Sequence, residues 1–206
     1  MNFYKKKLII FDLDGVLIDS KNTMKVALQL TSKEIGIKLL FSEYEKYLGL
    51  PFEEIMKKMG IKKNVNKIKK IYNFHASKTL KKIKINKNYL KVLKKLKKKY
   101  YLTIFTSKNR SRTKIILDKI KIFDFIITAE DVKYGKPNPE GINKIIKKFK
   151  VKKINVLFIG DSIFDYKASK SAKVKYRHAI WGYDQKINKM KNLKKVNNFN
   201  QIEGLF

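Results

Sequence analysis

The chain has 206 residues, 44% of them hydrophobic, which is enough for one α/β core with an inserted subdomain. It contains no cysteine, which excludes a disulfide framework and a thiolate metal site. The formal net charge of +33 raises the question of a nucleic-acid partner, yet only three of the 50 basic residues are arginine: Arg110, Arg112 and Arg177. Nucleic-acid sites favour arginine for its planar fork of donors, so a lysine excess spread over the whole chain indicates codon bias rather than a binding surface.

The first predicted element is a strand over 7–12, which ends in two carboxylates. Its apolar run continues directly into Asp12, and Asp14 follows two residues later, in the stretch "LIIFDLDGVLIDS". Residues i and i+2 of an extended chain point to the same side, so the two carboxylates would share one side of the strand end. A hard divalent cation such as Mg²⁺ would relieve their repulsion.

The next segment, about 19–84, has the spacing of helices rather than strands. Helical periodicity covers 22–35, 42–48, 52–59 and 65–83, and "LGLPFEE" at 48–54 interrupts it with glycine and proline. About 90 residues separate the first strand from the next strand, "YLTIFT", which is far more than a crossover needs. We therefore expect a helical cap over 19–84, inserted into a core made of 1–18 and 85–206.

The rest of the chain alternates between short apolar runs and longer periodic segments. The predicted strands are 101–106, 124–128, 154–160 and 176–181, and the predicted helices are 87–99, 110–120, 139–149 and 164–173. Alternation of this kind predicts an α/β fold with a doubly wound parallel sheet.

Polar residues follow several of these strands. Thr106 and Ser107 come after the second strand, Lys136 lies in a Gly/Pro loop before a helix, and Asp161 and Asp165 follow the strand "VLFIG". Each has an ordinary explanation, such as a helix cap or one of many surface lysines. Because the carboxyl ends of parallel strands meet at one edge, we expect all of them to join Asp12.

This set of residues is suited to phosphoryl transfer from a monoester. Asp12 would be the nucleophile, and Asp14 would carry the proton to the leaving alcohol and from the attacking water. Lys136, the Thr106 hydroxyl and backbone N–H groups near Ser107 would bind the phosphate. The predicted magnesium ligands are Asp12, Asp161 and the main-chain carbonyl of Asp14. Asp165 would orient Lys136 or a water molecule at the ion.

Four motifs, "DLDGV", "FTS", "GKPNPE" and "GDSIFD", occur in this order. With them the chain resembles the haloacid dehalogenase-like hydrolases, in particular the phosphoglycolate phosphatase-like branch. The resemblance implies a Rossmann-like sheet, a small α-helical cap, Mg²⁺ dependence and an aspartyl-phosphate intermediate. One departure is that Lys170 and Lys173 stand where this branch usually has glycines.

The predicted function is a Mg²⁺-dependent phosphatase for a small phosphorylated metabolite. Candidate substrates are phosphoglycolate, a sugar phosphate, or a glycerol- or amino-alcohol-type phosphate. One alternative is a sugar phosphomutase of the same superfamily, which "DGV" in place of "DGT" slightly favours. A nucleic-acid-binding or end-processing protein that uses the basic surface is another.

The N-terminal apolar stretch stops at Asp12 and is too short for a signal peptide, and no apolar run approaches the roughly 20 residues that a membrane span needs, so we expect a cytoplasmic protein. No obligate protein partner is evident. Leu50 and Pro51 are expected to shape the substrate pocket, whereas Trp181 and Tyr183 are expected to be packing residues.

Overall fold

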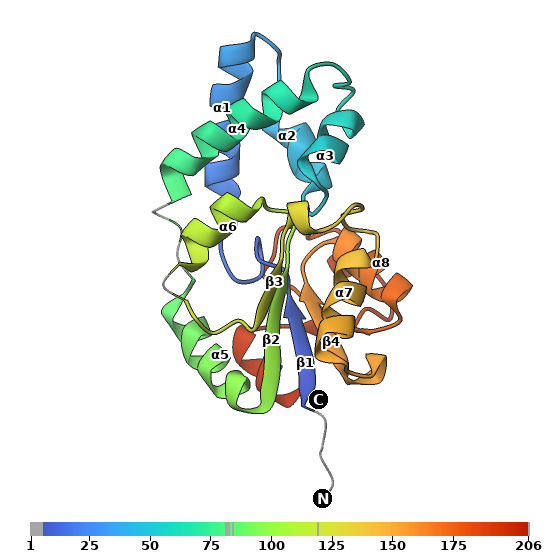
Figure 1. The fold of residues 1–206 in the computed structure, drawn as a ribbon. Helices are drawn as coiled ribbons and strands as arrows, with labels where there is room; N and C mark the ends of the chain where they lie inside the picture. Colours follow the sequence, from blue (N-terminus) through green and yellow to red (C-terminus); the bar gives the residue numbers. More distant parts are fainter. Residues whose placement is uncertain (1–5, 81–82, 84, 119, 206) are drawn as a thin grey trace, which may run out of the picture.

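Six strands in the described part of the chain form one parallel sheet in the order β3-β2-β1-β4-β5-β6 (Figure 1). The computed structural model describes residues 6–80, 83, 85–118 and 120–205. The strands are Lys7–Phe11 (β1), Tyr100–Phe105 (β2), Phe125–Ile127 (β3), Val156–Gly160 (β4), Lys175–Ala179 (β5) and Lys195–Val196 (β6). The predicted doubly wound parallel sheet is therefore confirmed. Strand β6 is additional, and with two residues it is too short to carry a periodic pattern.

The central strand β1 shows why its apolar run does not alternate with polar residues. Leu8 and Ile10 belong to the apolar cluster on one face of the sheet, whereas Ile9 and Phe11 belong to the cluster on the other face. All four side chains are fully buried. A strand covered on both faces is apolar at every position, which explains the unbroken apolar run.

Helices cover both faces of the sheet (Figure 1). Lys87–Lys99 (α5) and Arg110–Leu117 (α6) pack on the face that carries Ile9 and Phe11. Glu140–Phe149 (α7) and Ile163–Ala172 (α8) pack on the opposite face. The predicted helix over 110–120 includes residue 119, which lies outside the described residues. On α8, Lys170 is exposed, and Lys173 caps the helix in the left-handed conformation that usually favours glycine.

In the described part of the segment between β1 and α5 lie four α-helices, as the helical spacing predicted: Lys21–Ile35 (α1), Phe41–Tyr44 (α2), Phe52–Lys58 (α3) and Val65–Thr79 (α4). We call these the cap helices. They enclose a separate apolar cluster that includes Leu28, Met56 and Tyr72, and they stand beyond the carboxyl ends of the strands (Figure 1). The exact boundaries 19 and 84 stay a prediction, since residues 81, 82 and 84 of the predicted segment lie outside the described ranges.

Two predicted elements differ from the structure because a 3₁₀ turn stands where one end of the helix or strand was predicted. The predicted helix over 42–48 is split into α2 and a 3₁₀ turn at Glu45–Tyr47, just before Gly49 and Pro51. The predicted strand over 154–160 begins only at Val156, after a 3₁₀ turn at Lys153–Asn155. Among the helices of the described residues, none has the length and apolar character to cross a membrane.

Candidate active site

The two central strands bring two carboxylates to one edge of the sheet. Strands β1 and β4 are neighbours, with Phe11 opposite Ile159, and the Asp12 backbone N–H donates to the Ile159 carbonyl at 2.9 Å. Asp12 and Asp161 therefore follow adjacent strands at the point where the strand order reverses. Open α/β sheets bind their ligands at this point.

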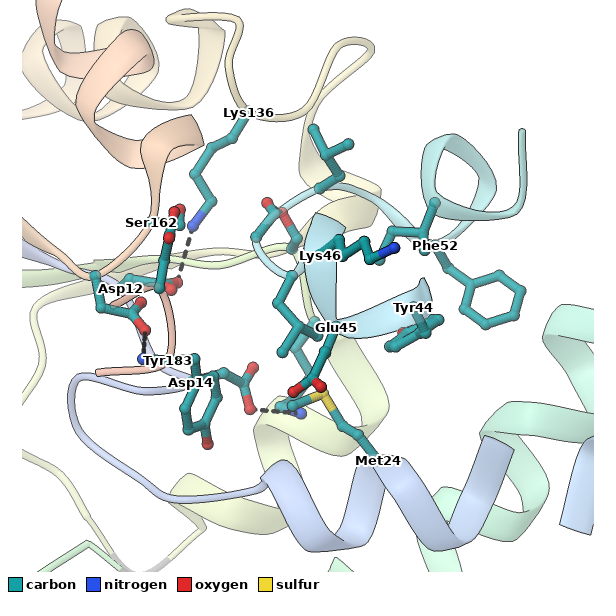
Figure 2. A pocket seen from close by; sticks show the side chains of 18 of the residues that line it. Asp12, Asp14, Met24, Tyr44, Glu45, Lys46, Phe52, Lys136, Ser162 and Tyr183 are labelled. Carbon is teal, nitrogen blue, oxygen red and sulfur yellow. Dashed lines mark hydrogen bonds and ion pairs between the residues drawn. The ribbon is translucent and has the colours of Figure 1, made fainter. Parts of the chain in front are cut away.

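Lys136 joins this pair to a third carboxylate. Its Nζ lies 2.9 Å from Asp12 Oδ1 and 2.7 Å from Asp165 Oδ1, and its side chain is fully buried. Figure 2 shows the Lys136 side chain extending to Asp12. The second oxygen of Asp165 accepts bonds from Ser162 Oγ at 2.7 Å and from the Ser162 N–H at 3.1 Å. One of many lysines in the sequence is thus the buried partner of two acids.

The electrostatics of this cluster are dominated by burial. Burial, together with repulsion from Asp165 and Asp14, raises the pKa of Asp12 to about 7 despite the attraction of Lys136. Burial and the nearby Asp12 likewise raise the pKa of Asp161 well above its ordinary value. Although burial alone disfavours the charged form of Lys136, Asp12 and Asp165 raise its pKa. Three buried acids share one lysine, which leaves an excess of negative charge.

The same carboxylates fit a metal ion. Asp12, Asp161 and Asp165 each offer an oxygen, and these oxygens lie within 4.8 Å of one another. Carboxylate oxygens are the preferred ligands of hard divalent cations, and a cation would offset the excess negative charge. Asp161 was predicted as a ligand. Asp165 belongs to the cluster too, although both of its oxygens are already bonded within the protein.

Two glycines pack closely against the Asp161 carboxylate. A Cβ atom on Gly15 would lie 2.1 Å from Asp161 Oδ2, and one on Gly182 would lie 2.1 Å from Asp161 Cβ. Gly15 also has φ of +83°, a conformation that other residues rarely adopt. The backbone N–H of Tyr183 donates to Asp161 Oδ2 at 2.6 Å. These contacts hold the carboxylate in one orientation.

Asp14 has different partners from Asp12. Its Oδ1 lies 2.9 Å from Lys108 Nζ, and it also accepts a hydrogen bond from the Ser20 hydroxyl. The Lys108 side chain is only 3% exposed. Both aspartates line the same cavity, in agreement with the expectation that they share one side (Figure 2).

The two predicted phosphate-binding residues of the second loop also line this cavity. Thr106 Oγ1 accepts a hydrogen bond from the Lys108 N–H at 3.1 Å, which leaves the hydroxyl proton available for a ligand. Ser107 Oγ donates to the Gly49 carbonyl at 2.7 Å, so its side chain contacts the loop between the cap helices. The structure therefore brings every predicted site residue to one region.

The cavity has a volume of about 360 Å³ and lies between the sheet edge and the cap helices. One side, which we call the strand-end wall, consists of Asp12, Thr106, Lys136 and Asp161. The other side, which we call the cap wall, consists of Met24, Tyr44, Leu50, Phe52, Ile55 and Tyr72. Figure 2 shows Asp12 and Lys136 on one side of the cavity, and Met24, Tyr44 and Phe52 on the other. A pocket of this size suits a small organic ligand.

Among the residues of this cavity that sequence reasoning missed are Lys108, Arg112 and Tyr183. The prediction that Tyr183 is a packing residue was wrong, because its N–H holds Asp161 and its hydroxyl accepts from the Ser20 N–H at 2.6 Å. Lys108 directly follows Thr106 and Ser107 in the sequence, and this position could have indicated that it belongs to the site. Of the two expected pocket residues, Leu50 lines the cavity. The ring of Pro51 instead packs against Gly135, where a Cβ atom added to Gly135 would lie 2.4 Å from Pro51 Cγ.

The parallel sheet carries buried acids and a lysine at its switch point, beneath the cap helices, which is where doubly wound α/β proteins bind their ligands. Residues 9–179 match the haloacid dehalogenase-like hydrolases, and the chain belongs to this family. The resemblance drawn from the motifs is thereby confirmed, and the protein is a hydrolase with phosphatase relatives.

Relatives with two different names are similar to this chain over most of their length. A phosphoglycolate phosphatase of Aquifex aeolicus is 29% identical over 185 residues, which is 86% of each chain. The pyrophosphatase PpaX of Oceanobacillus iheyensis is 26% identical over 179 residues, which is 85% of this chain and 84% of that protein.

Solved structures agree with the fold. A hydrolase from Pseudomonas syringae superimposes with a TM-score of 0.84 at 22% identity, covering 97% of each chain. A haloacid dehalogenase-like family hydrolase from Streptococcus pneumoniae gives a TM-score of 0.82 at 20% identity, covering 97% of this chain and 98% of that one. The predicted Rossmann-like α/β architecture with a cap is thus shared with known structures.

Proposed function

We propose that this hydrolase is a Mg²⁺-dependent phosphatase that cleaves a small phosphomonoester through an aspartyl-phosphate on Asp12. The main support is the position of Asp12. It follows the central strand, lines a cavity of about 360 Å³, and is held at 2.9 Å by the buried ammonium of Lys136. A positioned carboxylate beside a fixed cation is what attack on a phosphate ester requires.

The reaction consists of two displacements at phosphorus. In the first, an Asp12 oxygen forms a bond to phosphorus, the ester P–O bond breaks, and Asp14 gives a proton to the departing alcohol. In the second, water attacks the phosphoryl group, Asp14 takes a proton from it, and the Asp12 carboxylate is released with inorganic phosphate. Lys136 and the Thr106 hydroxyl stabilise the phosphoryl oxygens in both steps.

Asp12, Asp161 and the main-chain carbonyl of Asp14 are the groups proposed to hold magnesium. The bound ion would supply positive charge beside the phosphoryl oxygens. We assign Asp165 the role of fixing Lys136, since its carboxylate already accepts bonds from Lys136 and Ser162. The excess of negative charge around the three buried acids supports this division of roles.

The proposal is tested by trapping the intermediate. The protein is mixed with ³²P-labelled aryl phosphate and magnesium, quenched in acid, and digested for mass spectrometry. We expect one acid-stable, hydroxylamine-sensitive phosphoryl group on the peptide that carries Asp12. Rapid turnover without any labelled protein would instead indicate direct attack by water, and absence of turnover on every ester would overturn the phosphatase assignment.

Inorganic pyrophosphate is a second candidate substrate, because several of the relatives are PpaX pyrophosphatases. The same two displacements would then release phosphate in place of an alcohol. Ranking kcat/KM for pyrophosphate against a panel of phosphomonoesters, all with magnesium, distinguishes the two candidates. We expect a monoester to rank first, because the cap wall is largely apolar and aromatic.

A further inference from the structure

Arg112 is a buried cation that the proposed reaction does not use. It is only 7% exposed and lines the cavity. Its Nε donates to Asn109 Oδ1 at 2.7 Å, and its guanidinium carbon lies 5.3 Å from the centre of the Tyr72 ring. Within the described residues it forms no ion pair with a carboxylate. The ring offsets only part of the cost of burying this charge.

The position of Arg112 in its helix adds to this cost. Asn109 caps the N-terminus of α6, so Arg112 stands in the first turn, which contains no acidic residue. The N-terminal end of a helix carries partial positive charge, which disfavours a cation there by roughly 0.3–1 kcal/mol. Stability alone therefore gives no reason for an arginine at this position.

The charged residues near Arg112 are paired with one another and do not neutralise its positive charge. Lys108, four residues earlier, is paired with Asp14 at 2.9 Å. At the edge of the cavity, Glu45 is paired with Lys21 at 2.6 Å, and Lys46 with Glu43 at 2.7 Å. These pairs are neutral in sum. The cavity thus has one buried positive charge in excess on the side of Asp14, beside the cap wall.

We infer that Arg112, with Lys108 beside it, binds a carboxylate on the alcohol part of the substrate. This inference rests on the proposed function, in which Asp14 serves the leaving alcohol and so marks the side on which that alcohol lies. A planar guanidinium fork matches a carboxylate with two parallel hydrogen bonds. The substrate class is then a small phosphorylated hydroxy acid.

The charge balance favours a carboxylate over a second phosphoryl group. One uncompensated cation matches a monoanion, whereas a terminal phosphate would bring up to two charges. The rings of Phe52 and Tyr72, whose centroids are 4.8 Å apart, border the same cavity and present mainly apolar surface to it. Pyrophosphate therefore fits this region less well than a carboxylate does.

The test compares two esters of the same length. Phosphoglycolate carries a carboxylate where ethyl phosphate carries a methyl group. For the wild-type protein with magnesium, we expect kcat/KM for phosphoglycolate to exceed that for ethyl phosphate by about 10²- to 10³-fold, the range expected for a buried charged pair. In Arg112→Gln, activity on phosphoglycolate should fall by about 10²-fold, while activity on ethyl phosphate and 4-nitrophenyl phosphate stays within about threefold.

Two further variants keep the result interpretable. Lys114→Gln removes a positive charge from an exposed position of the same helix. It should change kcat/KM neither for phosphoglycolate nor for ethyl phosphate. Arg112→Lys keeps the charge but loses the fork, so it should recover part of the phosphoglycolate activity. Activity on the two esters without a carboxylate also reports whether each variant is folded.

The outcomes separate this inference from the proposed function. Equal use of both esters by the wild-type protein, a preference for pyrophosphate, or an equal loss on all esters in Arg112→Gln would overturn the carboxylate site and leave the phosphatase intact. Failure of the wild-type protein to cleave any ester would remove the proposed function, and the inference with it.

Discussion

The strand-end wall and the cap wall of the cavity hold their side chains by different means. On the strand-end wall, charged side chains hold one another through ion pairs: Lys136 Nζ lies 2.9 Å from Asp12 and 2.7 Å from Asp165. On the cap wall, rings pack on rings, with the Tyr44 and Tyr72 centroids 6.0 Å apart. On the strand-end wall, ion pairs fix the orientation of each charged group. On the cap wall, apolar contacts have no strong directional preference.

This difference suggests a division of labour. The apolar cap wall would exclude water, and charges act more strongly on one another when water is excluded. The strand-end wall would supply the chemistry common to all substrates, and the cap side would select the alcohol. Changes to the strand-end wall should therefore affect every ester, whereas changes near the cap should affect esters unequally.

The largest effect is expected from Asp12→Asn. Asparagine keeps the shape but removes the proposed nucleophile, so hydrolysis of every ester should fall by about 10⁴-fold or more, as removal of a nucleophile does in other covalent enzymes. Rapid-quench experiments should show no phosphorylated protein. Covalent phosphoenzyme in this variant would mean that another group is the nucleophile.

Removal of the metal should be nearly as severe. EDTA is expected to abolish hydrolysis of 4-nitrophenyl phosphate and magnesium to restore it, because three buried acids share one lysine. Undiminished turnover in EDTA would contradict the metal site on the strand-end wall.

The metal should also change how stability depends on pH. The folded state raises the pKa of Asp12 from 3.8 to about 7, so it binds this proton more tightly than the unfolded state does. Without metal, the contribution of Asp12 to stability is present below pH 3.8 and is lost as the pH rises through about 7. Because magnesium competes with the proton, it should raise Tm more at pH 8 than at pH 5. Equal shifts at both pH values would contradict this coupling.

The strand-end wall was predictable from the sequence, whereas most of its surroundings were not. Asp12 and Asp161 directly follow apolar runs, and parallel strands bring their carboxyl ends together, so a local pattern was sufficient. Tyr183 contacts Asp161 and Ser20, which are 22 and 163 residues away in the sequence. Arg112 meets Tyr72 from a different helix. No periodic pattern encodes such contacts, because they depend on how the cap helices pack against the core.

Asp14→Asn distinguishes the proposed role of Asp14 from that of Asp12. This variant keeps the proposed nucleophile Asp12 but lacks the proposed proton carrier, so steady-state hydrolysis of alkyl phosphates should fall by about 10²- to 10⁴-fold. The burst on an aryl phosphate should be largely retained, since an activated phenol needs little protonation to leave. Burst kinetics on both substrates provide the measurement. Equal losses would show that Asp14 does not act as the proton carrier.

Gly15→Ala tests how the strand-end wall is positioned. The new Cβ would meet Asp161 Oδ2 at 2.1 Å, so the carboxylate must move, and we expect a loss of about 10- to 100-fold in magnesium affinity or activity. Gly60→Ala is a matched control, because Gly60 has φ of +82° and nothing within 4 Å of its Cβ position. Both variants should lose about 1 kcal/mol of stability to backbone strain. If both lost the same activity, strain rather than displacement of Asp161 would be the cause.

The smallest effect is expected where the two walls meet. Ser107 Oγ donates to the Gly49 carbonyl at 2.7 Å, and this bond links the loop after β2 to the loop between the cap helices. In Ser107→Ala this bond is lost, while the backbone N–H groups proposed to bind phosphate remain. The bond contributes about 1 kcal/mol, so KM should rise by about fivefold with kcat nearly unchanged. Hydrogen exchange should show faster exchange at 48–54 but not along β1. A fall in kcat on all esters would instead make the Ser107 hydroxyl part of the strand-end wall, and the boundary between the two walls would have to be redrawn.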